Sequence, residues 1–333
     1  MIAKPLSGTS RLALVTGGAG YIGMGACAEL AASGRRVRVL DVLLHDQQER
    51  AAELVEQGVE VIRGDIRDPE ARAKALAGAD EVVHLAAIVG DPACAVDPEL
   101  SHAVNVEGSR LLVREARDAG VERMVFASTC SNYGRMADPS VPITEDGDLA
   151  PVSLYAEQKV GIERALLADD LTPLLPTCLR FATVYGVAPR MRFDLTVNEF
   201  TRDLWADRHL EVFGEQFWRP YVHVRDAGRA IVHVLDQPVE KVGGRVYNVG
   251  RSGENYRKLD IVAEIRRQTA NGAVSYVART EDPRDYQVSF DRIANELGFA
   301  TTRTVPDGIA EVIAGLEAGA FGDPFARAHR NTD

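Results

Sequence analysis

Residues 11–23, RLALVTGGAGYIG, decide the fold of this 333-residue chain. The first six of them form a short apolar run that is typical of a buried β-strand, and a segment with helical spacing starts at Gly20. Gly17, Gly20 and Gly23 permit a tight turn, and they let backbone amides at a helix N-terminus approach a phosphate group. The stretch therefore predicts a strand–loop–helix unit that binds the diphosphate of a dinucleotide.

Apolar runs alternate with helical segments over the first 180 or so residues. The runs that we interpret as strands are residues 11–16, 36–40, 59–63, 81–85, 121–127 and 174–181. Strands that alternate with helices are joined by right-handed crossovers and form a parallel sheet buried on both faces. The order predicts an α/β fold with a Rossmann-type, doubly wound parallel sheet.

The second half of the chain has a looser pattern. We expect helices at residues 191–208, 222–235 and 259–269, and short strands at 210–213 and 245–249. We therefore expect residues 1–182 to form a dinucleotide-binding domain and residues 183–333 to form mainly a smaller, mixed substrate-binding lobe. The two are interleaved, with segments near 220–250 returning to the first domain. The lobe is expected to cover the carboxyl ends of the parallel strands, where α/β folds bind ligands.

An acidic residue at the end of the second strand indicates which dinucleotide binds. Asp41 lies 18 residues after Gly23. A carboxylate there can accept hydrogen bonds from the adenosine ribose and would repel a 2′-phosphate, so it favours NAD over NADP. The neighbouring Arg35, Arg36 and Arg38 leave NADP open.

Tyr155 and Lys159 are the predicted catalytic pair. They are four residues apart and so lie on one face of a helix. A phenol is a poor base at neutral pH, but a nearby ammonium and a positively charged nicotinamide ring both favour the phenolate. Tyr155 could then take a hydroxyl proton while a hydride passes to NAD. The hydroxyl-rich residues 126–134 would hold the substrate oxygen, so we predict an oxidoreductase acting on a hydroxyl or a ketone.

Two further segments fit a cofactor site. Asp65 follows the third strand and would lie near the adenine amino group, unless it is only a solvated turn residue. The fourth strand ends in residues 84–87, HLAA, whose small side chains allow close approach of a cofactor. His84 itself is expected to be a packed core histidine.

Composition excludes several other classes. The net charge of −11 disfavours nucleic acid and anionic membranes as partners, so a phosphate-bearing ligand needs local arginines or helix N-termini. The four cysteines have no metal-ligand or disulfide spacing, and we expect no metal site. Neither a signal peptide nor a membrane-spanning run is evident, which predicts a cytoplasmic protein.

Taken in order, these motifs resemble the extended short-chain dehydrogenase/reductase family, in its NAD-dependent nucleotide-sugar epimerase/dehydratase branch. The resemblance runs from Leu12 to Phe299 and includes TGGAGYIG, GDI, HLAA, the hydroxyl segment, YxxxK and RPYVHVRD. It implies that Thr129 is the catalytic hydroxyl, that Tyr155 is the base and that Lys159 binds the nicotinamide ribose. It also implies a homodimer that binds a nucleotide-diphosphate sugar.

The motifs and the resemblance together give two sets of binding residues. The cofactor set is Gly17, Gly20, Tyr21, Ile22, Gly23, Asp41, Asp65, Ile66, Leu85, Ala86, Ala87, Asn105, Ser128, Tyr155, Lys159 and Phe181. The substrate set is Thr129, Ser131, Thr183, Arg192, Asp194, Leu195, Arg219 and Arg284. By the resemblance, Arg219 grips the nucleotide diphosphate, for which the forked guanidinium is suited.

Departures from the family pattern bear on the reaction. Sugar 4,6-dehydratases resemble one another in an Asp-Glu pair directly after the catalytic Thr, and this chain has Cys130 and Ser131 there. Dehydration is therefore disfavoured, and C4 epimerisation through a transient 4-keto sugar is the leading hypothesis. Thr183, which replaces an Asn frequent in epimerases, keeps open a keto-sugar reductase or an atypical dehydratase. A non-catalytic NAD-binding protein is disfavoured because the catalytic Thr, Tyr and Lys are all present. We expect Cys130 to be a buried, inert thiol.

Overall fold

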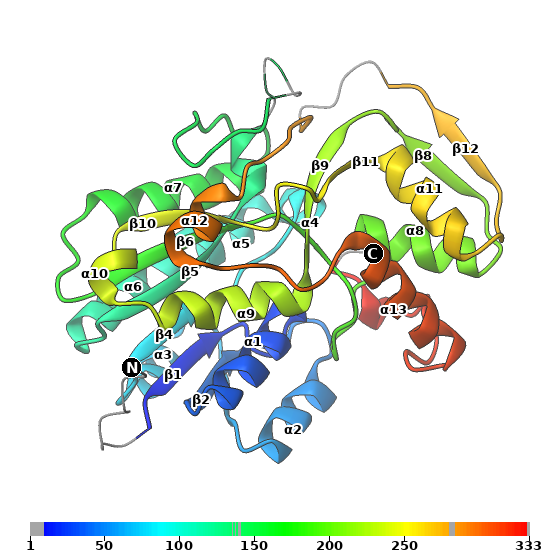
Figure 1. The fold of residues 1–333 in the computed structure, drawn as a ribbon. Coiled ribbons are helices and arrows are strands. Elements are labelled where there is room, and N and C mark those ends of the chain that lie inside the picture. Colours follow the sequence, from blue (N-terminus) through cyan, green and yellow to red (C-terminus); the bar gives the residue numbers. More distant parts are fainter. Residues whose placement is uncertain (1–9, 135, 137, 139–140, 280–283, 332–333) are drawn as a thin grey trace, which may run out of the picture.

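A seven-stranded parallel sheet forms the centre of the large domain (Figure 1). The computed structural model describes residues 10–134, 136, 138, 141–279 and 284–331, so part of the N-terminal stretch considered for a signal peptide, residues 1–9, lies outside them. The strands are β1 (Leu12–Thr16), β2 (Arg36–Asp41), β3 (Glu60–Arg63), β4 (Glu81–His84), β5 (Arg123–Thr129), β6 (Leu175–Phe181) and β10 (Arg245–Val249). Their order is β10-β6-β5-β4-β1-β2-β3, and every neighbouring pair is parallel. The predicted Rossmann-type sheet is confirmed.

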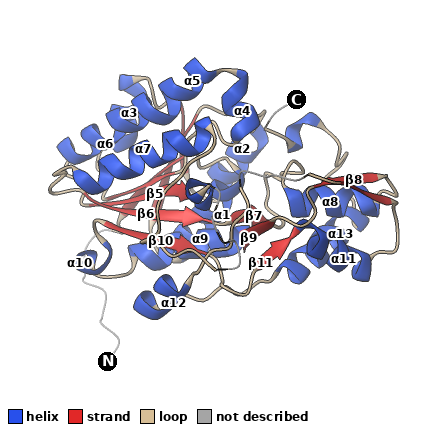
Figure 2. Cartoon of the chain, turned by 90° about the horizontal axis from the view of Figure 1, so that it is seen from above, coloured by secondary structure: helices blue, strands red, loops and turns tan. Residues whose placement is uncertain are grey.

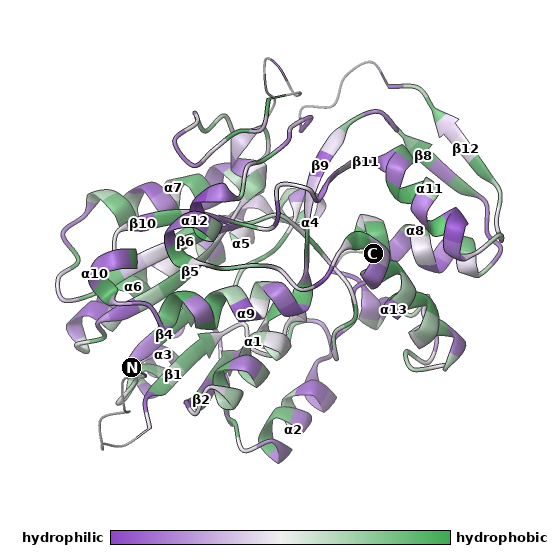
Figure 3. Cartoon of the chain, in the orientation of Figure 1, coloured by the Kyte–Doolittle hydropathy of each residue, from purple (hydrophilic) through white to green (hydrophobic). Residues whose placement is uncertain are grey.

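Helices cover both faces of this sheet (Figure 2). One layer holds α1 (Tyr21–Ala32), α2 (Gln48–Glu56) and α9 (Val224–Leu235), and the other holds α3 (Pro69–Leu76), α6 (Ser109–Asp118) and α7 (Leu154–Ala168). Successive residues of β1 serve the two layers in turn: Val15 belongs to the first core and Leu14 to the second. Both faces of β1 are therefore apolar, as its green colour in Figure 3 shows.

Shorter elements lie between β4 and α6, and the large domain also takes in parts of the second half of the chain. The helices α4 (Asp91–Val96) and α5 (Pro98–His102) lead into a π-helix, Ala103–Gly108. The strand β10 and the helix α9 come from the 220–250 region, after which α12 (Asp291–Leu297) also packs against the core through Ile293 and Leu297. The short helix α10 (Val239–Val242) connects α9 to β10.

The smaller lobe is mixed. It contains a three-stranded sheet of β7 (Thr183–Tyr185), β9 (Trp218–His223) and β11 (Asn255–Arg257), and a parallel pair of β8 (Leu210–Phe213) with β12 (Val274–Val277). The helices α8 (Thr196–Trp205), α11 (Lys258–Gln268) and α13 (Val305–Glu317) pack together around their own apolar core, and a short 3₁₀ turn, Arg327–His329, follows.

Two predicted helix starts and one predicted helix end are wrong, since the helix expected at 191–208 ends at Trp205. The helix expected at 191–208 begins at Thr196, because residues 186–195 form a loop in which Met191 and Phe193 are buried by contacts with other segments. The helix expected at 222–235 begins at Val224, because Val222 and His223 are still paired with β7 as part of β9.

The described part of the chain contains neither a membrane-spanning helix nor a metal-binding cluster. None of the described helices is both long and apolar enough to cross a membrane. Within the same residues, no group of three or more His, Cys, Asp or Glu side chains is placed to hold a metal ion. The four cysteines are free, buried thiols.

Candidate active site

One cavity of about 540 Å³ lies at the carboxyl ends of the parallel strands and between the two lobes. All but two of the predicted site residues line it. They are Gly17, Gly20, Tyr21, Ile22, Gly23, Asp41, Asp65, Ile66, Leu85, Ala86, Ala87, Ser128, Thr129, Ser131, Tyr155, Lys159, Phe181, Thr183, Arg192, Leu195, Arg219 and Arg284. The exceptions are Asn105 and Asp194.

The glycine loop forms a surface of bare backbone at one end of the cavity. Gly17 has a φ of +74°, and a Cβ there would lie 2.8 Å from the backbone nitrogen of Ala86. A Cβ on Gly23 would lie 2.2 Å from the carbonyl oxygen of Gly17. No side chain caps the N-terminus of α1, so its amides and partial positive charge face the cavity. The loop fits a dinucleotide diphosphate.

The side chain of Asp41 is held by the protein itself. It is 7% exposed, and it accepts hydrogen bonds from the backbone N–H groups of Ala19 at 3.0 Å and Leu43 at 2.9 Å. Burial raises the pKa of the Asp41 carboxyl, and the two amides oppose that effect. The carboxylate thus fixes the glycine loop against the end of β2 in addition to facing the cavity.

The three arginines that left NADP open do not line the cavity. Arg35 pairs with Glu81 and Asp236, and Arg38 pairs with Glu60. The Nε of Arg36 donates to the carbonyl of Ser10. Asp41 therefore lines the predicted adenosine end of the cavity, and none of these three arginines lies beside it to bind a 2′-phosphate.

Asp65 and Ile66 form the floor beyond β3. The Asp65 carboxylate is in an ion pair with Arg67 at 2.6 Å, and hydrogen bonds from Arg67 lower its pKa. Ile66 is buried in the core next to Gly108. These contacts leave Asp65 at the cavity surface and anchor Ile66 in the domain.

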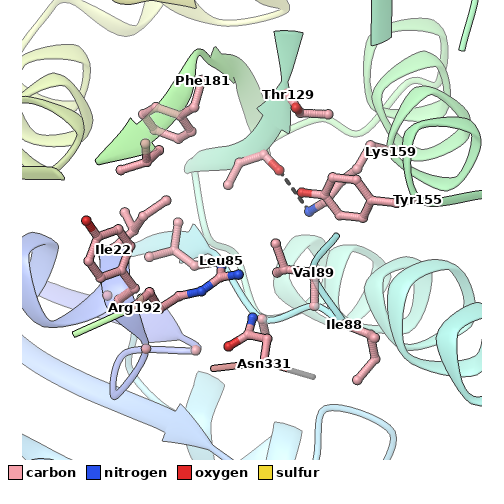
Figure 4. Close-up of a pocket in the computed structure, with 18 of the residues that line it drawn as sticks. Ile22, Leu85, Ile88, Val89, Thr129, Tyr155, Lys159, Phe181, Arg192 and Asn331 are labelled. Carbon is pink, nitrogen blue, oxygen red and sulfur yellow. Dashed lines mark hydrogen bonds between the residues drawn. The ribbon is translucent and has the colours of Figure 1, made fainter. Parts of the chain in front are cut away.

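The catalytic trio comes from two neighbouring elements. Thr129 ends β5, while Tyr155 and Lys159 lie on α7, whose first turn is capped by Ser153 (Figure 4). The Nζ of Lys159 donates to the carbonyl of Ala127 at 2.9 Å and lies 5.9 Å from the centre of the Tyr155 ring. The geometry brings the three predicted residues to one wall of the cavity.

Burial dominates the electrostatics of the pair. It lowers the pKa of Lys159 to about 8. It raises the pKa of Tyr155, Cys94 adds to that shift, and Arg192 opposes it. In the protein alone, desolvation of the phenol dominates, and the charge that opposes it is that of Arg192. The lowering of the Tyr155 pKa expected from Lys159 together with a positively charged nicotinamide ring stays a prediction.

A buried network supports this wall from behind. Glu163 on α7 and Arg180 on β6 form an ion pair at 2.5 Å, with side chains 1% and 4% exposed. The hydroxyl of Ser128 donates to Glu163, so Ser128 faces the cavity without offering its side-chain donor to a ligand. Cys130 is buried beside the same network and donates to the carbonyl of Arg180, and burial raises the pKa of its thiol. The prediction of a buried thiol is confirmed.

Asn105 lies behind the residues that line the cavity. It accepts a hydrogen bond from the backbone of Ile88 at 2.8 Å and donates to Gln158 on α7 at 2.8 Å. It therefore ties the loop after β4 to the catalytic helix without lining the cavity. His84 is equally internal, between Thr16 and Ser109, and burial lowers its pKa to about 3, as expected for a packed core histidine.

Basic side chains gather on the lobe side of the cavity. Those that line it are Arg190, Arg192, Arg219, Lys258 and Arg284. Arg192 is held by two hydrogen bonds to Asp194, which explains why Asp194 lies behind the wall. Arg284 forms an ion pair with Asp91 at 2.9 Å. The local positive charge that the acidic chain needs for an anionic ligand is present.

Sequence reasoning missed several parts of the wall. Lys258, Tyr286 and Asn331 are among the residues that line the cavity and were not predicted as site residues. Lys258 opens α11, where its Nζ donates to the carbonyl of Phe213, and Asn331 lies near the end of the chain. A basic residue at a helix start was a weak signal for Lys258, and nothing local marked Asn331.

The comparison with protein families agrees with this geometry. The NAD dependent epimerase/dehydratase family matches residues 13–250. The chain belongs to this family. It is therefore an NAD-dependent enzyme, and its site is that of a nucleotide-sugar epimerase/dehydratase family member.

Relatives within the family include more than one activity. The UDP-glucose 4-epimerase of Corynebacterium glutamicum is 30% identical over 87% of this chain and 91% of that relative. The dTDP-glucose 4,6-dehydratase of Streptomyces griseus is 31% identical over 90% of this chain and 92% of that relative. Among solved structures, UDP-glucose 4-epimerase of Thermus thermophilus with NAD has a TM-score of 0.81 at 27% identity, covering 92% of this chain and 99% of that one.

Proposed function

We propose that this enzyme is a nucleotide-sugar 4-epimerase that passes through a transient 4-keto sugar. The observation that carries the proposal is the distribution of carboxylates. Among the described residues that line the cavity, the only carboxylates are Asp41 and Asp65, at the ends of β2 and β3. The catalytic wall, formed by β5 and α7, is distant from both in the sheet order. A dehydratase needs an acid and a base near the sugar, whereas epimerisation needs only reversible redox chemistry at one carbon.

The chain's own residues supply the remaining steps. NAD, when bound, provides a reversible hydride acceptor. Tyr155 takes the proton from the C4 hydroxyl and later returns it, and the Thr129 hydroxyl donates a hydrogen bond to the same sugar oxygen. Arg192, whose charge opposes the raised pKa of Tyr155, stabilises the phenolate. Arg219, which lines the lobe side of the cavity, holds the diphosphate while the keto sugar turns.

A panel of UDP-, dTDP-, GDP- and CDP-sugars tests the reaction. We expect the purified enzyme, with no added coenzyme, to convert one hexose into a mixture with its C4 epimer, detected by NMR. Net consumption of NADH with a 4-keto sugar would instead identify a reductase. Accumulation of a 4-keto-6-deoxy sugar would identify a dehydratase. Either result contradicts the proposal.

Two substitutions test the assigned roles. Tyr155→Phe removes the proton acceptor and is expected to lower kcat by roughly 10²- to 10⁴-fold. Cys130→Ser is the matched control, because this thiol is buried outside the cavity and its change should alter kcat by less than about threefold. Unchanged turnover in Tyr155→Phe would refute the mechanism.

We also propose that the enzyme is a cytoplasmic homodimer. The family resemblance supports the dimer, and the four free thiols suit a reducing compartment. Size-exclusion chromatography with light scattering measures the assembly directly, and a monomeric mass at micromolar concentration would contradict it.

A further inference from the structure

We propose that residues 321–331 form a clasp over the bound dinucleotide, and that Asn331 binds the cofactor directly. The inference rests on the cofactor site assigned to the glycine loop and not on the sugar reaction. Asn331 lines the same cavity as Tyr155 and Gly17.

Three hydrogen bonds fasten this clasp to the loop that precedes α8. The backbone N–H of Phe193 donates to the carbonyl of His329 at 2.8 Å. The guanidinium of Arg190 donates to the carbonyl of Arg330 at 3.1 Å. The backbone N–H of Asn331 donates to Asp194 at 3.0 Å. Because Asp194 also holds Arg192, the clasp and a cavity-lining guanidinium share one carboxylate.

Aromatic side chains pack the clasp against the smaller lobe. The Phe325 ring lies under two guanidiniums, with Arg208 at 3.4 Å and Arg202 at 4.6 Å from its centre. The Phe321 ring meets Phe193 edge-on, with the ring centres 5.3 Å apart. Phe193 itself is fully buried, so the segment is packed into the lobe and is part of its structure.

Two unpartnered polar atoms lie on this side of the cavity. Within the described part of the chain, the Oδ1 of Asn331 and the Nε of Arg190 are buried without a hydrogen-bond partner, and both residues line the cavity. A buried polar atom left unpaired costs free energy, so a ligand that supplies the missing partner is stabilised. A ribose hydroxyl can donate to the Asn331 oxygen, and a phosphate can accept from Arg190. A dinucleotide carries both groups.

Charge effects place these groups on the cofactor half of the cavity. Burial, together with the charges of Arg190 and Arg192, lowers the pKa of His45 to about 4. His45 lies four residues beyond Asp41 and lines the same cavity. Arg192 also opposes the burial that raises the pKa of Tyr21, the first residue of α1. The charges of both guanidiniums therefore reach His45 beyond the end of β2, and that of Arg192 also reaches the first residue of α1.

Figure 4 shows where Asn331, the last residue of the clasp, lies in the cavity. Arg192 and Asn331 lie across the cavity from Thr129, with Ile88 and Val89 beside the catalytic wall. A dinucleotide between these walls is covered by the clasp, and it leaves only after residues 321–331 move. We therefore expect slow release of the cofactor to depend on this segment.

The rate of NAD release tests the clasp without any sugar. The protein is loaded with labelled NAD, diluted into excess unlabelled NAD and sampled over time. Asn331→Ala removes one hydrogen bond and is expected to speed release about fivefold to tenfold. Asn271→Ala, at an exposed position away from the cavity, is the matched control and should release NAD at the wild-type rate.

A shortened chain ending at residue 320 extends the test. It is expected to release NAD faster than Asn331→Ala, with circular dichroism showing whether the fold is kept. If it does not fold, Asn331→Ala decides the matter alone. If Asn331→Ala releases NAD at the wild-type rate, the proposed direct contact is wrong. If a folded shortened chain releases NAD at the wild-type rate, the proposed clasp is wrong. A wild-type protein that never binds NAD would overturn the cofactor site as well, whereas a failed sugar panel would not.

Discussion

At the scale of one residue, Lys159 has a predicted catalytic role, and its burial as a charged group lowers the stability of the folded protein. Its ammonium is buried, 4.8 Å from the centre of the Phe126 ring, with the carbonyl of Ala127 as its hydrogen-bond acceptor. Desolvation lowers its pKa from 10.5 to about 8. The charged form is thus less favourable in the folded protein than in the unfolded chain.

Replacing Lys159 with Met should therefore stabilise the protein at neutral pH. Below pH 8 the folded state bears the full penalty, on the order of 3 kcal/mol, which the lost hydrogen bond offsets by about 1 kcal/mol. Between pH 8 and 10.5 the unfolded state binds more protons, so the wild type gains stability as pH rises and the advantage of the variant disappears. Thermal melts at pH 7 and pH 10 measure this, and a lower Tm for the variant at pH 7 would contradict it.

Residue-level prediction from sequence succeeded where chemistry and spacing occur together in a short motif. Tyr155 and Lys159 are one helical turn apart, so local pattern was enough to place them on one face of α7. Thr129, in contrast, was singled out among the hydroxyls of residues 126–134 by the family resemblance. The position of Asn331 depends on a contact with Asp194, 137 residues away. Local pattern carries no information about such a contact.

At the scale of elements, one buried ion pair fixes the catalytic helix. Glu163 on α7 faces Arg180 on β6, and Arg180 also donates to the hydroxyl of Tyr133. The pair holds α7 in register with the strand next to β5. The position of Tyr155, two turns earlier on α7, depends on it.

Removing the carboxylate should be costly. Glu163→Ala leaves the Arg180 charge buried without its partner, which is expected to lower the free energy of unfolding by about 3–5 kcal/mol. Glu157→Ala, at an exposed position on the same helix, should cost less than about 1 kcal/mol. Urea denaturation of both variants measures the difference, and equal losses would show that the ion pair does not anchor α7.

The bounds of a strand or helix were predicted well where its buried residues follow the regular spacing of that element along the sequence. The strands β1 to β6 were predicted within a few residues because each is a short apolar run between turns. The loop at 186–195 was assigned in part to a helix, because Met191, Phe193 and Leu195 are apolar. Their burial comes from α13 and the C-terminal segment, which sequence spacing does not reveal.

At the scale of the whole molecule, the two halves of the chain share one core. The strand β10 pairs with β6 along the sheet edge, and α9 packs on α1 so closely that a Cβ on Gly228 would lie 3.1 Å from the backbone of Gly25. A boundary at residue 182 therefore separates the predicted cofactor-binding and substrate-binding parts of the sequence. It does not separate two independently packed cores.

A fragment of residues 1–182 should not fold alone. It lacks β10 and α9, which leaves the β6 edge unpaired and the apolar surface of α1 exposed. We expect aggregation, or a broad thermal transition without NAD binding, whereas the full chain melts cooperatively. A soluble monomeric fragment with a sharp melt and bound NAD would contradict this expectation.

Asp41 accepts hydrogen bonds from two backbone amides, and this has a consequence for any attempt to change the coenzyme preference from NAD to NADP. A residue that only discriminated between NAD and NADP could be exchanged freely by an engineer or by an evolving lineage. Here the same carboxylate is a structural brace between the glycine loop at Ala19 and the bend at Leu43. Substituting it would leave two donors to be satisfied anew. Coenzyme preference in this enzyme is thus bound to loop stability, and the two have to be redesigned together.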